Sequence, residues 1–436
     1  MMFGWPQILR LGLVQAAFGS IVVLTTATMN RVMAVELAMP AVLPGLLVSV
    51  YYATQFMRPR FGHGADQGGR RTPWIIGGVL VLALGAVCAA LSVGLMGTAP
   101  AWGIAAAVPS FVLIGVGIGA GATNLLALLA THVDEDRQAA AGSAVWILMI
   151  AGLAVTAIVA GKFLDPFSPM RLVQVTLVVC AVAVALALVG VWGQEGDARA
   201  RPAAAGRSFG DVARDIWADP RTRAFTLFVF VSMLAYNLQD LILEPFAGHV
   251  FGYSVGESTA LGGQHHAGAL SGMLLVLICG SVLGRWVRVP IQVWIIGGCL
   301  VSGAALMALA YGAQQAPVWP LGPNVFVLGL ANGIFAVAAI GAMMALACDG
   351  RDAREGARMG VFGAAQALGF GLGSFAGTVL SDVMRATLGS DALGYGAVFG
   401  FEGLIFLIAA ALGLKLTFGG ASAPLYSTNP SPIAGE

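Results

Sequence analysis

The sequence predicts an all-α, polytopic membrane protein whose twelve transmembrane helices form two related six-helix halves. Composition is the first reason: 58% of the 436 residues are hydrophobic and only 10% are charged. The mean hydropathy of +0.87 lies far outside the range of soluble globular domains. The second reason is a series of long apolar runs, each able to cross a hydrocarbon core about 30 Å thick. The third is that basic residues gather in alternate loops, a pattern typical of cytoplasmic loops.

The first half, residues 1–192, contains six apolar runs separated by clusters of Arg, Asp, Pro and Gly. The first run follows Arg10 and does not end in a small-residue cleavage site. We therefore interpret it as a retained helix and not as a removable signal peptide. The predicted spans are 11–30, 41–57, 74–96, 101–130, 140–160 and 171–192.

The longest polar stretch, residues 193–222, is the predicted cytoplasmic linker between the halves. Some of its apolar residues share one helical face, namely Phe209, Val212, Ile216 and Trp217. One interpretation is a short amphipathic helix lying on the membrane surface. The other is an ordered linker that binds no partner.

The second half, residues 223–418, repeats the first. The pentapeptide Trp-Ile-Ile-Gly-Gly opens the third predicted helix at 74–78 and the ninth at 294–298. Duplicated six-helix halves are typical of the major facilitator superfamily. A Gly-, Ser- and Pro-rich tail, residues 419–436, is predicted to be disordered. The spans of the second half are 223–244, 266–284, 292–312, 320–348, 358–380 and 395–418.

The distribution of the 22 Lys and Arg residues predicts the orientation of the chain. Nearly all of them fall on one side of the membrane, the exceptions being Arg31, Lys162, Arg171 and Arg385. We therefore expect both termini in the cytoplasm. The five cysteines all lie within apolar runs and lack CxxC spacing, so we expect neither disulfides nor a metal site.

The loop between the second and third spans matches the superfamily signature G-x-x-x-D-x-x-G-R-R. The matching residues are Gly62, Asp66, Gly69, Arg70 and Arg71. Glycines permit a tight reversal between two helices, and an aspartate can pair with basic groups or with a helix N-terminus. The motif is also compatible with a purely structural hairpin.

Several segments carry a narrower resemblance. They include Thr25-Thr26-Ala27-Thr28-Met29-Asn30-Arg31, Arg58-Pro59-Arg60-Phe61-Gly62-His63-Gly64, Arg70 to Gly78, Leu238-Gln239-Asp240-Leu241-Ile242-Leu243-Glu244-Pro245 and Ser254 to Thr259. With these segments the chain resembles the PucC/LhaA family, also called the bacteriochlorophyll delivery family, over nearly its whole length. A shorter branch of that family is named after a chain of bacteriochlorophyll synthase.

The resemblance implies a helper of photosynthetic complexes in the intracytoplasmic photosynthetic membrane, a part of the bacterial inner membrane. The expected partners are light-harvesting antenna subunits, chlorophyll synthase and bacteriochlorophyll. We expect no nucleic acid partner and no tightly bound cofactor, with bacteriochlorophyll as a transient ligand. Composition and spacing alone predict only a membrane protein of the superfamily.

Charged and polar residues near membrane depth form a candidate interior site. They lie at the ends of the first and seventh predicted spans, and are Arg31, Glu36, Asn237, Asp240 and Glu244. Helical spacing places the last three on one face, and we expect Arg31 to neutralise Asp240 or Glu244. Because burial of charge in a membrane is costly, three interpretations remain open: a structural ion pair, a substrate or proton-coupling site, and interfacial exposure.

Histidines are the natural axial ligands for the magnesium of bacteriochlorophyll. Three of them, His249, His265 and His266, are predicted at the non-cytoplasmic surface, outside the helix centres. There they either receive pigment transiently or have no functional role. Glycines at four-residue spacing, Gly369, Gly373 and Gly377, predict either close helix packing or a flat slot for a macrocycle.

Three classes of function follow. The leading hypothesis is an assembly factor of light-harvesting complexes that delivers or handles bacteriochlorophyll. The alternatives are a proton-coupled transporter of small solutes and an accessory subunit of a bacteriochlorophyll synthase complex. An enzyme is disfavoured, because the sequence offers no nucleophile with a base and no Asp-rich pair that could hold a magnesium diphosphate.

Overall fold

The computed structural model describes residues 3–54, 57, 61, 70–133, 135–195, 220–281, 289–348 and 355–415. Within these ranges the chain is helical apart from short connections, and no strand is formed. The amphipathic face of the linker (Phe209, Val212, Ile216, Trp217), the tail 419–436 and Gly62, Asp66 and Gly69 of the hairpin lie outside the described residues. The boundaries of the linker and tail therefore stay predictions.

The N-terminal half begins with a long irregular helix. It runs through α1 (Trp5–Val23), η1 (Leu24–Thr28), α2 (Met29–Arg31) and η2 (Val32–Glu36). The remaining helices are α3 (Val42–Thr54), α5 (Thr72–Met96), α6 (Pro100–His132), α7 (Glu135–Leu164) and α8 (Pro169–Val191).

The C-terminal half begins with a broken helix, α10 (Pro220–Leu238) followed by α11 (Leu243–Phe251). The other helices are α12 (Val255–Ser281), α13 (Ile291–Gly312) with the short η4 (Ala313–Gln315), α14 (Leu321–Cys348), α15 (Glu355–Leu388) and α16 (Asp391–Lys415).

Ten described helices are long and apolar enough to cross a membrane. Two others complete the predicted set of twelve. The described part of α3 has 13 residues, and α12 has 27 residues but carries the polar sequence Gln264-His265-His266. The fold class is confirmed, but several predicted boundaries are wrong: among others, the first helix extends to Glu36, α12 begins at Val255 and α15 extends to Leu388. Arg31 in the first helix and His265 in α12 are buried by neighbouring segments.

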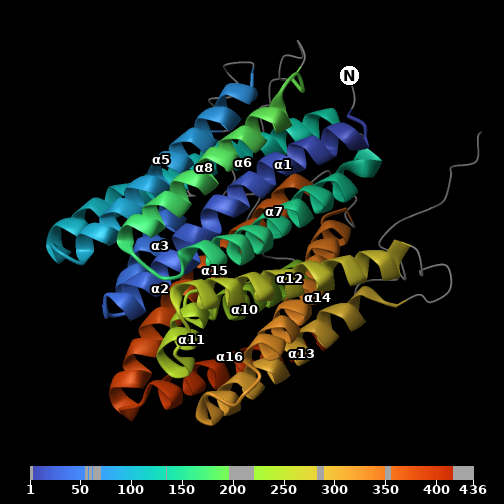
Figure 1. Cartoon of the computed structure of the whole chain (residues 1–436). Helices are drawn as coiled ribbons and strands as arrows, with labels where there is room; N and C mark the ends of the chain where they lie inside the picture. The colour runs from blue at the N-terminus through green and yellow to red at the C-terminus, as the bar shows by residue number, and fades with distance from the viewer. Residues whose placement is uncertain are drawn as a thin grey trace, which may run out of the picture.

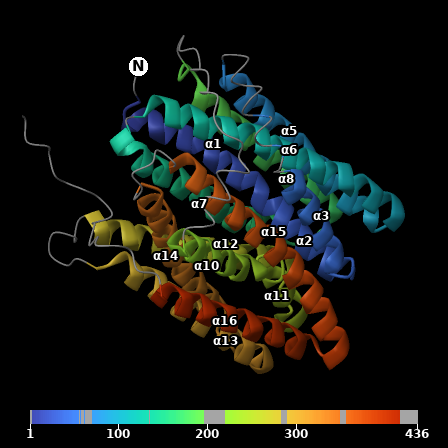
Figure 2. The same ribbon diagram turned by 180° about the vertical axis from the view of Figure 1, so that it is seen from behind.

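The two halves pack side by side, with the blue to green helices in one group and the yellow to red helices in the other (Figures 1 and 2). Within the halves, α5 packs on α6, α1 on α7 and α8, α13 on α14 and α16, and α10 on α15. Two pairs, α7 with α12 and α3 with α15, carry most of the contact between halves. We call the end of the bundle formed by connections 37–41, 165–168, 252–254 and 389–390 the distal end, because it lies opposite the N-terminus.

Glycines make the close contacts within the bundle possible. A Cβ atom at Gly373 would collide with the carbonyl oxygen of Leu234 on α10, and one at Gly377 with that of Leu238. Small residues let helix backbones approach where lipid offers no hydrophobic driving force. The spacing of these glycines therefore serves close packing of α15 on α10.

Candidate functional site

The first and seventh membrane helices are both irregular where they meet. In the first, the N–H of Met29 bonds to the carbonyl of Leu24, and that of Leu37 to the carbonyl of Val32. These wide turns of the π type often occur at functional sites. In the seventh, residues 239–242 form a turn between α10 and α11.

Pro245 explains why the seventh helix breaks. A proline has no N–H, so the carbonyl of Leu241, four residues earlier, has no helical donor. The side-chain amide of Asn30 in the first helix donates to that carbonyl instead. Both residues are buried, and the bond joins the two halves of the protein.

Arg31 is 98% buried at the same seam and pairs with a carboxylate of its own half. Its Nη1 lies 2.5 Å from Oε1 of Glu36, and its Nη2 donates to the carbonyl of Tyr253 at 2.6 Å. Among the described residues, Arg31 forms its salt bridge with Glu36 and forms none with Asp240 or Glu244. The wide turn over Val32–Glu36 brings Glu36 back toward Arg31, and Gly252, with φ of +71°, ends α11 just before Tyr253.

Glu244 is buried in α11 and faces α12. Its Oε2 lies 3.5 Å from the hydroxyl of Thr259, which is itself 3.2 Å from the hydroxyl of Thr28 in the first helix. A Cβ atom at Gly262 would collide with Oε1 of Glu244. That oxygen has no hydrogen-bond partner among the described residues. Glu244 is thus a buried carboxyl with free acceptor capacity between the halves.

The prediction that Asn237, Asp240 and Glu244 share one helical face is wrong, because the break separates them. Asn237, in the last turn of α10, donates to the carbonyl of Phe370 at 2.9 Å and to the hydroxyl of Ser374. Asp240 is half-buried in the turn, and Glu244 lies beyond it.

Two of the histidines lie inside a membrane helix and not at the surface, which corrects the prediction. His265 is buried in α12, where its Nε2 lies 3.4 Å from the amide nitrogens of Gln239 and Asn332. Ser302 continues this network by donating to Oδ1 of Asn332 at 2.8 Å. Two polar partners, Gln239 in the turn between α10 and α11 and Asn332 in α14, stabilise the buried imidazole.

His266 differs from its neighbour. Its Nδ1 is buried and has no hydrogen-bond partner among the described residues. Helical spacing places His266 on the face of α12 that carries Thr259 and Gly262, the face that packs on Glu244. Of the three histidines considered as ligands, His266 alone retains a buried ring nitrogen without a partner in the described part of the chain.

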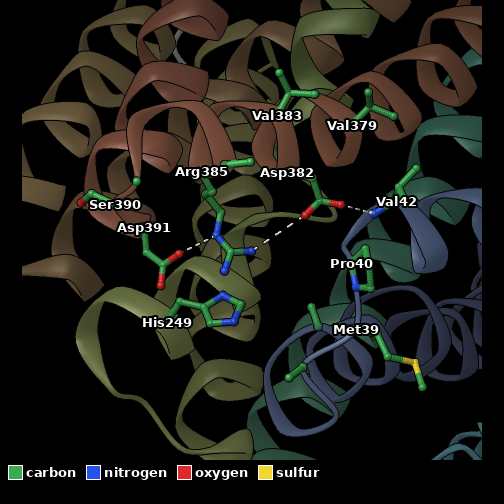
Figure 3. Close-up of a pocket in the computed structure, with 14 residues that line it drawn as sticks. Met39, Pro40, Val42, His249, Val379, Asp382, Val383, Arg385, Ser390 and Asp391 are labelled. Atoms are coloured by element: carbon green, nitrogen blue, oxygen red, sulfur yellow. Dashed lines mark hydrogen bonds and ion pairs between the residues drawn. The ribbon is translucent and has the colours of Figure 1, made fainter.

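His249 lines a cavity of about 950 Å³ at the distal end (Figure 3). Its Nδ1 lies 3.0 Å from the hydroxyl of Tyr395. Beside His249, Arg385 bonds to Asp391 at 2.6 Å and lies 3.9 Å from Asp382 (Figure 3). The opposite wall is the connection from Met39 to Val42, so both halves line the cavity.

The described end of the hairpin motif shows one contact that sequence reasoning missed. The carboxylate of Glu195, just after α8, accepts from the backbone N–H groups of Arg71 and Thr72. It thereby caps the N-terminus of α5, where orphan N–H groups and the helix dipole favour a carboxylate. No local sequence pattern predicts this cap, because the partners are more than a hundred residues apart.

Other functional candidates were also missed. Pro245 could have predicted the break in the seventh helix. The network around His265 and the distal contacts of Asp165 and Asp382 could not be predicted, because they depend on packing between distant segments.

The chain has the fold of the major facilitator superfamily. A bacterial homologue of the human lysosomal transporter Spinster is similar over 96% of this chain and 100% of its own, with a TM-score of 0.68 and 16% identity. The nucleoside transporter NupG is similar over 94% of this chain and 99% of its own, with a TM-score of 0.69 and 15% identity.

A family model described as PUCC protein matches residues 28–420, and the chain belongs to the PucC family. It is 48% identical over 427 residues to the "Bacteriochlorophyll synthase 44.5 kDa chain" of Rhodobacter capsulatus, covering 97% of this chain and 99% of the relative. It is 30% identical over 433 residues to "Protein PucC" of the same organism, covering 94% of this chain and 92% of the relative.

Proposed function

We propose that this chain is a membrane assembly factor of photosynthetic light-harvesting complexes that handles bacteriochlorophyll during antenna assembly or pigment biosynthesis. The observation that carries the proposal is the match, over nearly its full length, to a relative named as a chain of bacteriochlorophyll synthase. The matching PucC proteins support it. Antenna subunits and chlorophyll synthase are the partners that this role requires, in the photosynthetic membrane with both termini in the cytoplasm.

The seam between the first helix, α11 and α12 is the proposed handling site. It offers Oε1 of Glu244 and Nδ1 of His266, which have no hydrogen-bond partner in the described part of the chain, and an imidazole nitrogen is a suitable ligand for a magnesium tetrapyrrole. His265 and His249 are less suited, because Gln239 and Asn332 contact the first and Tyr395 the second. The chain itself would act as a carrier, with no chemical step.

Purification from photosynthetically grown cells tests this function. We expect bacteriochlorophyll, antenna subunits or chlorophyll synthase to co-purify with the wild-type chain. The His266→Ala variant should retain less pigment at unchanged membrane levels, while His249→Ala should retain the wild-type amount. A deletion strain with normal absorbance in every antenna band would contradict the proposal.

A proton-coupled solute transporter is the second candidate. The observation in its favour is Glu244, a buried carboxyl at the junction of two helix interruptions, because ionisable groups in this position commonly serve proton relays. Saturable uptake of a small solute into proteoliposomes that is driven by a proton gradient and lost in Glu244→Gln would favour this candidate over pigment handling. An accessory role in a bacteriochlorophyll synthase complex is the third candidate, and stable co-purification with the synthase alone would favour it.

A further inference from the structure

At the distal end, an aspartate of the C-terminal half caps a helix of the N-terminal half. Oδ2 of Asp382, on α15, accepts from the backbone N–H of Val42 at 2.8 Å. Val42 is the first residue of α3, so this N–H is one of those that the helix itself cannot satisfy. Figure 3 shows the bond at the edge of the distal cavity.

The N-terminal half makes the reciprocal contact. Asp165, directly after α7, accepts from the backbone N–H of Gly256 at 3.0 Å through Oδ1 and from the hydroxyl of Ser254 at 2.6 Å through Oδ2. Gly256 is the second residue of α12. A Cβ atom at Gly256 would collide with the Asp165 carboxylate, so glycine is needed for this approach.

The two caps are related by the internal repeat. Asp165 follows the fifth membrane helix, α7, and caps the eighth, α12. Asp382 lies near the end of the eleventh, α15, and caps the second, α3. Their separation along the chain is nearly that of the two copies of Trp-Ile-Ile-Gly-Gly. The capped pairs, α3 with α15 and α7 with α12, are also the main contacts between the halves.

We propose that Asp165 and Asp382 form a double latch that holds the distal end closed by capping, from each half, a helix N-terminus of the other. Separation of the halves at this end would leave two helix N-termini without their carboxylates, and both the lost charge-assisted bonds and the helix dipole oppose it. Opening of one cap also weakens the other, because both span the same seam. The latch controls access to the seam from the distal side and does not depend on which ligand is handled there.

Distance measurement between spin labels in lipid nanodiscs tests the latch. The label sites are two exposed residues of opposite halves, Thr98 just after α5 and Gln314 in η4 at the end of α13. The full-length protein is used, with its native cysteines replaced. Loss of a cap costs about 0.5–2 kcal/mol, so Asp165→Ala or Asp382→Ala should raise the ratio of long to short distances about 2- to 30-fold. The double variant should raise it further, and Asn at either position should restore much of the closed population, since Asn also caps helices.

Matched controls come from the same region. Asp391→Ala removes a carboxylate that binds Arg385 within the C-terminal half, and Glu257→Ala removes one that accepts from Ser254 N–H within the same half. Both should leave the distance distribution unchanged. An unchanged distribution in folded Asp165→Ala and Asp382→Ala, or an equal shift in the controls, would overturn the latch. If the double variant does not fold, the single variants against these controls decide the question, and pigment content plays no part in it.

Discussion

The side-chain amide of Asn30 donates to the carbonyl oxygen of Leu241, the acceptor that Pro245 leaves without a helical donor. One side chain of the first membrane helix thus supplies the hydrogen-bond donor that a backbone carbonyl of the seventh helix lacks. A buried carbonyl without a partner costs about 1–3 kcal/mol, so this bond stabilises both the break and the seam between the halves.

Asn30→Ala should therefore lower the free energy of unfolding by about 1–3 kcal/mol, measured by thermal unfolding in detergent. Asn30→Asp should cost at least as much, because a carboxylate cannot donate. In a Pro245→Ala background, residue 245 regains an N–H that can serve the Leu241 carbonyl, and Asn30→Ala should cost less. Equal losses in both backgrounds would refute this account of the break.

The Arg31–Glu36 pair should respond asymmetrically to substitution. Arg31 is 2% exposed and Glu36 is 35% exposed, and Arg31 also serves the carbonyl of Tyr253. Glu36→Gln should cost about 3–5 kcal/mol, the range for breaking a buried pair, because it leaves the buried guanidinium of Arg31 without its carboxylate. Arg31→Gln should cost less, because the carboxylate that remains at Glu36 is partly exposed to solvent. Comparable shifts in melting temperature for the two variants would show that the pair does not behave as a buried one.

Glycines on α15 should separate into essential and dispensable positions. Gly373→Ala would place a methyl group against the carbonyl of Leu234 and force α15 away from α10, at about 1–3 kcal/mol. Gly371→Ala is the matched control, because its new Cβ would lie 3.6 Å from Cβ of Tyr52, an ordinary contact. Size-exclusion profiles and melting temperatures should separate the two variants, and equal stability would argue against tight packing here.

The orientation predicted from the basic loops is testable with fusions. Green fluorescent protein at the C-terminus should fluoresce, and alkaline phosphatase fused after Ser168 should be active, because the connection between α7 and α8 lies at the distal end. The matched fusion within the linker, after Arg207, should be inactive as a phosphatase. Reversed activities would place the distal end in the cytoplasm and contradict the rule applied to the basic residues.

The sequence by itself determined the membrane class, the twelve helices and the repeated halves. Long apolar runs, a duplicated pentapeptide and the distribution of arginines are local or additive properties, and they survive without knowledge of packing. Four of the residues predicted for an interior site, Arg31, Glu36, Asn237 and Glu244, lie at or beside the seam between the halves.

Only the tertiary structure decided how these residues are paired. The wide turns of the first helix bring Glu36 to Arg31, the break at Pro245 separates Asn237 from Glu244, and α12 buries His265 among Gln239 and Asn332. Each of these pairings depends on an irregular backbone or on partners that are distant in the chain. Neither can be predicted from ideal helical spacing. The caps of Asp165 and Asp382 have the same origin: a carboxylate finds an orphan N–H only after two halves, folded separately along the chain, pack against each other.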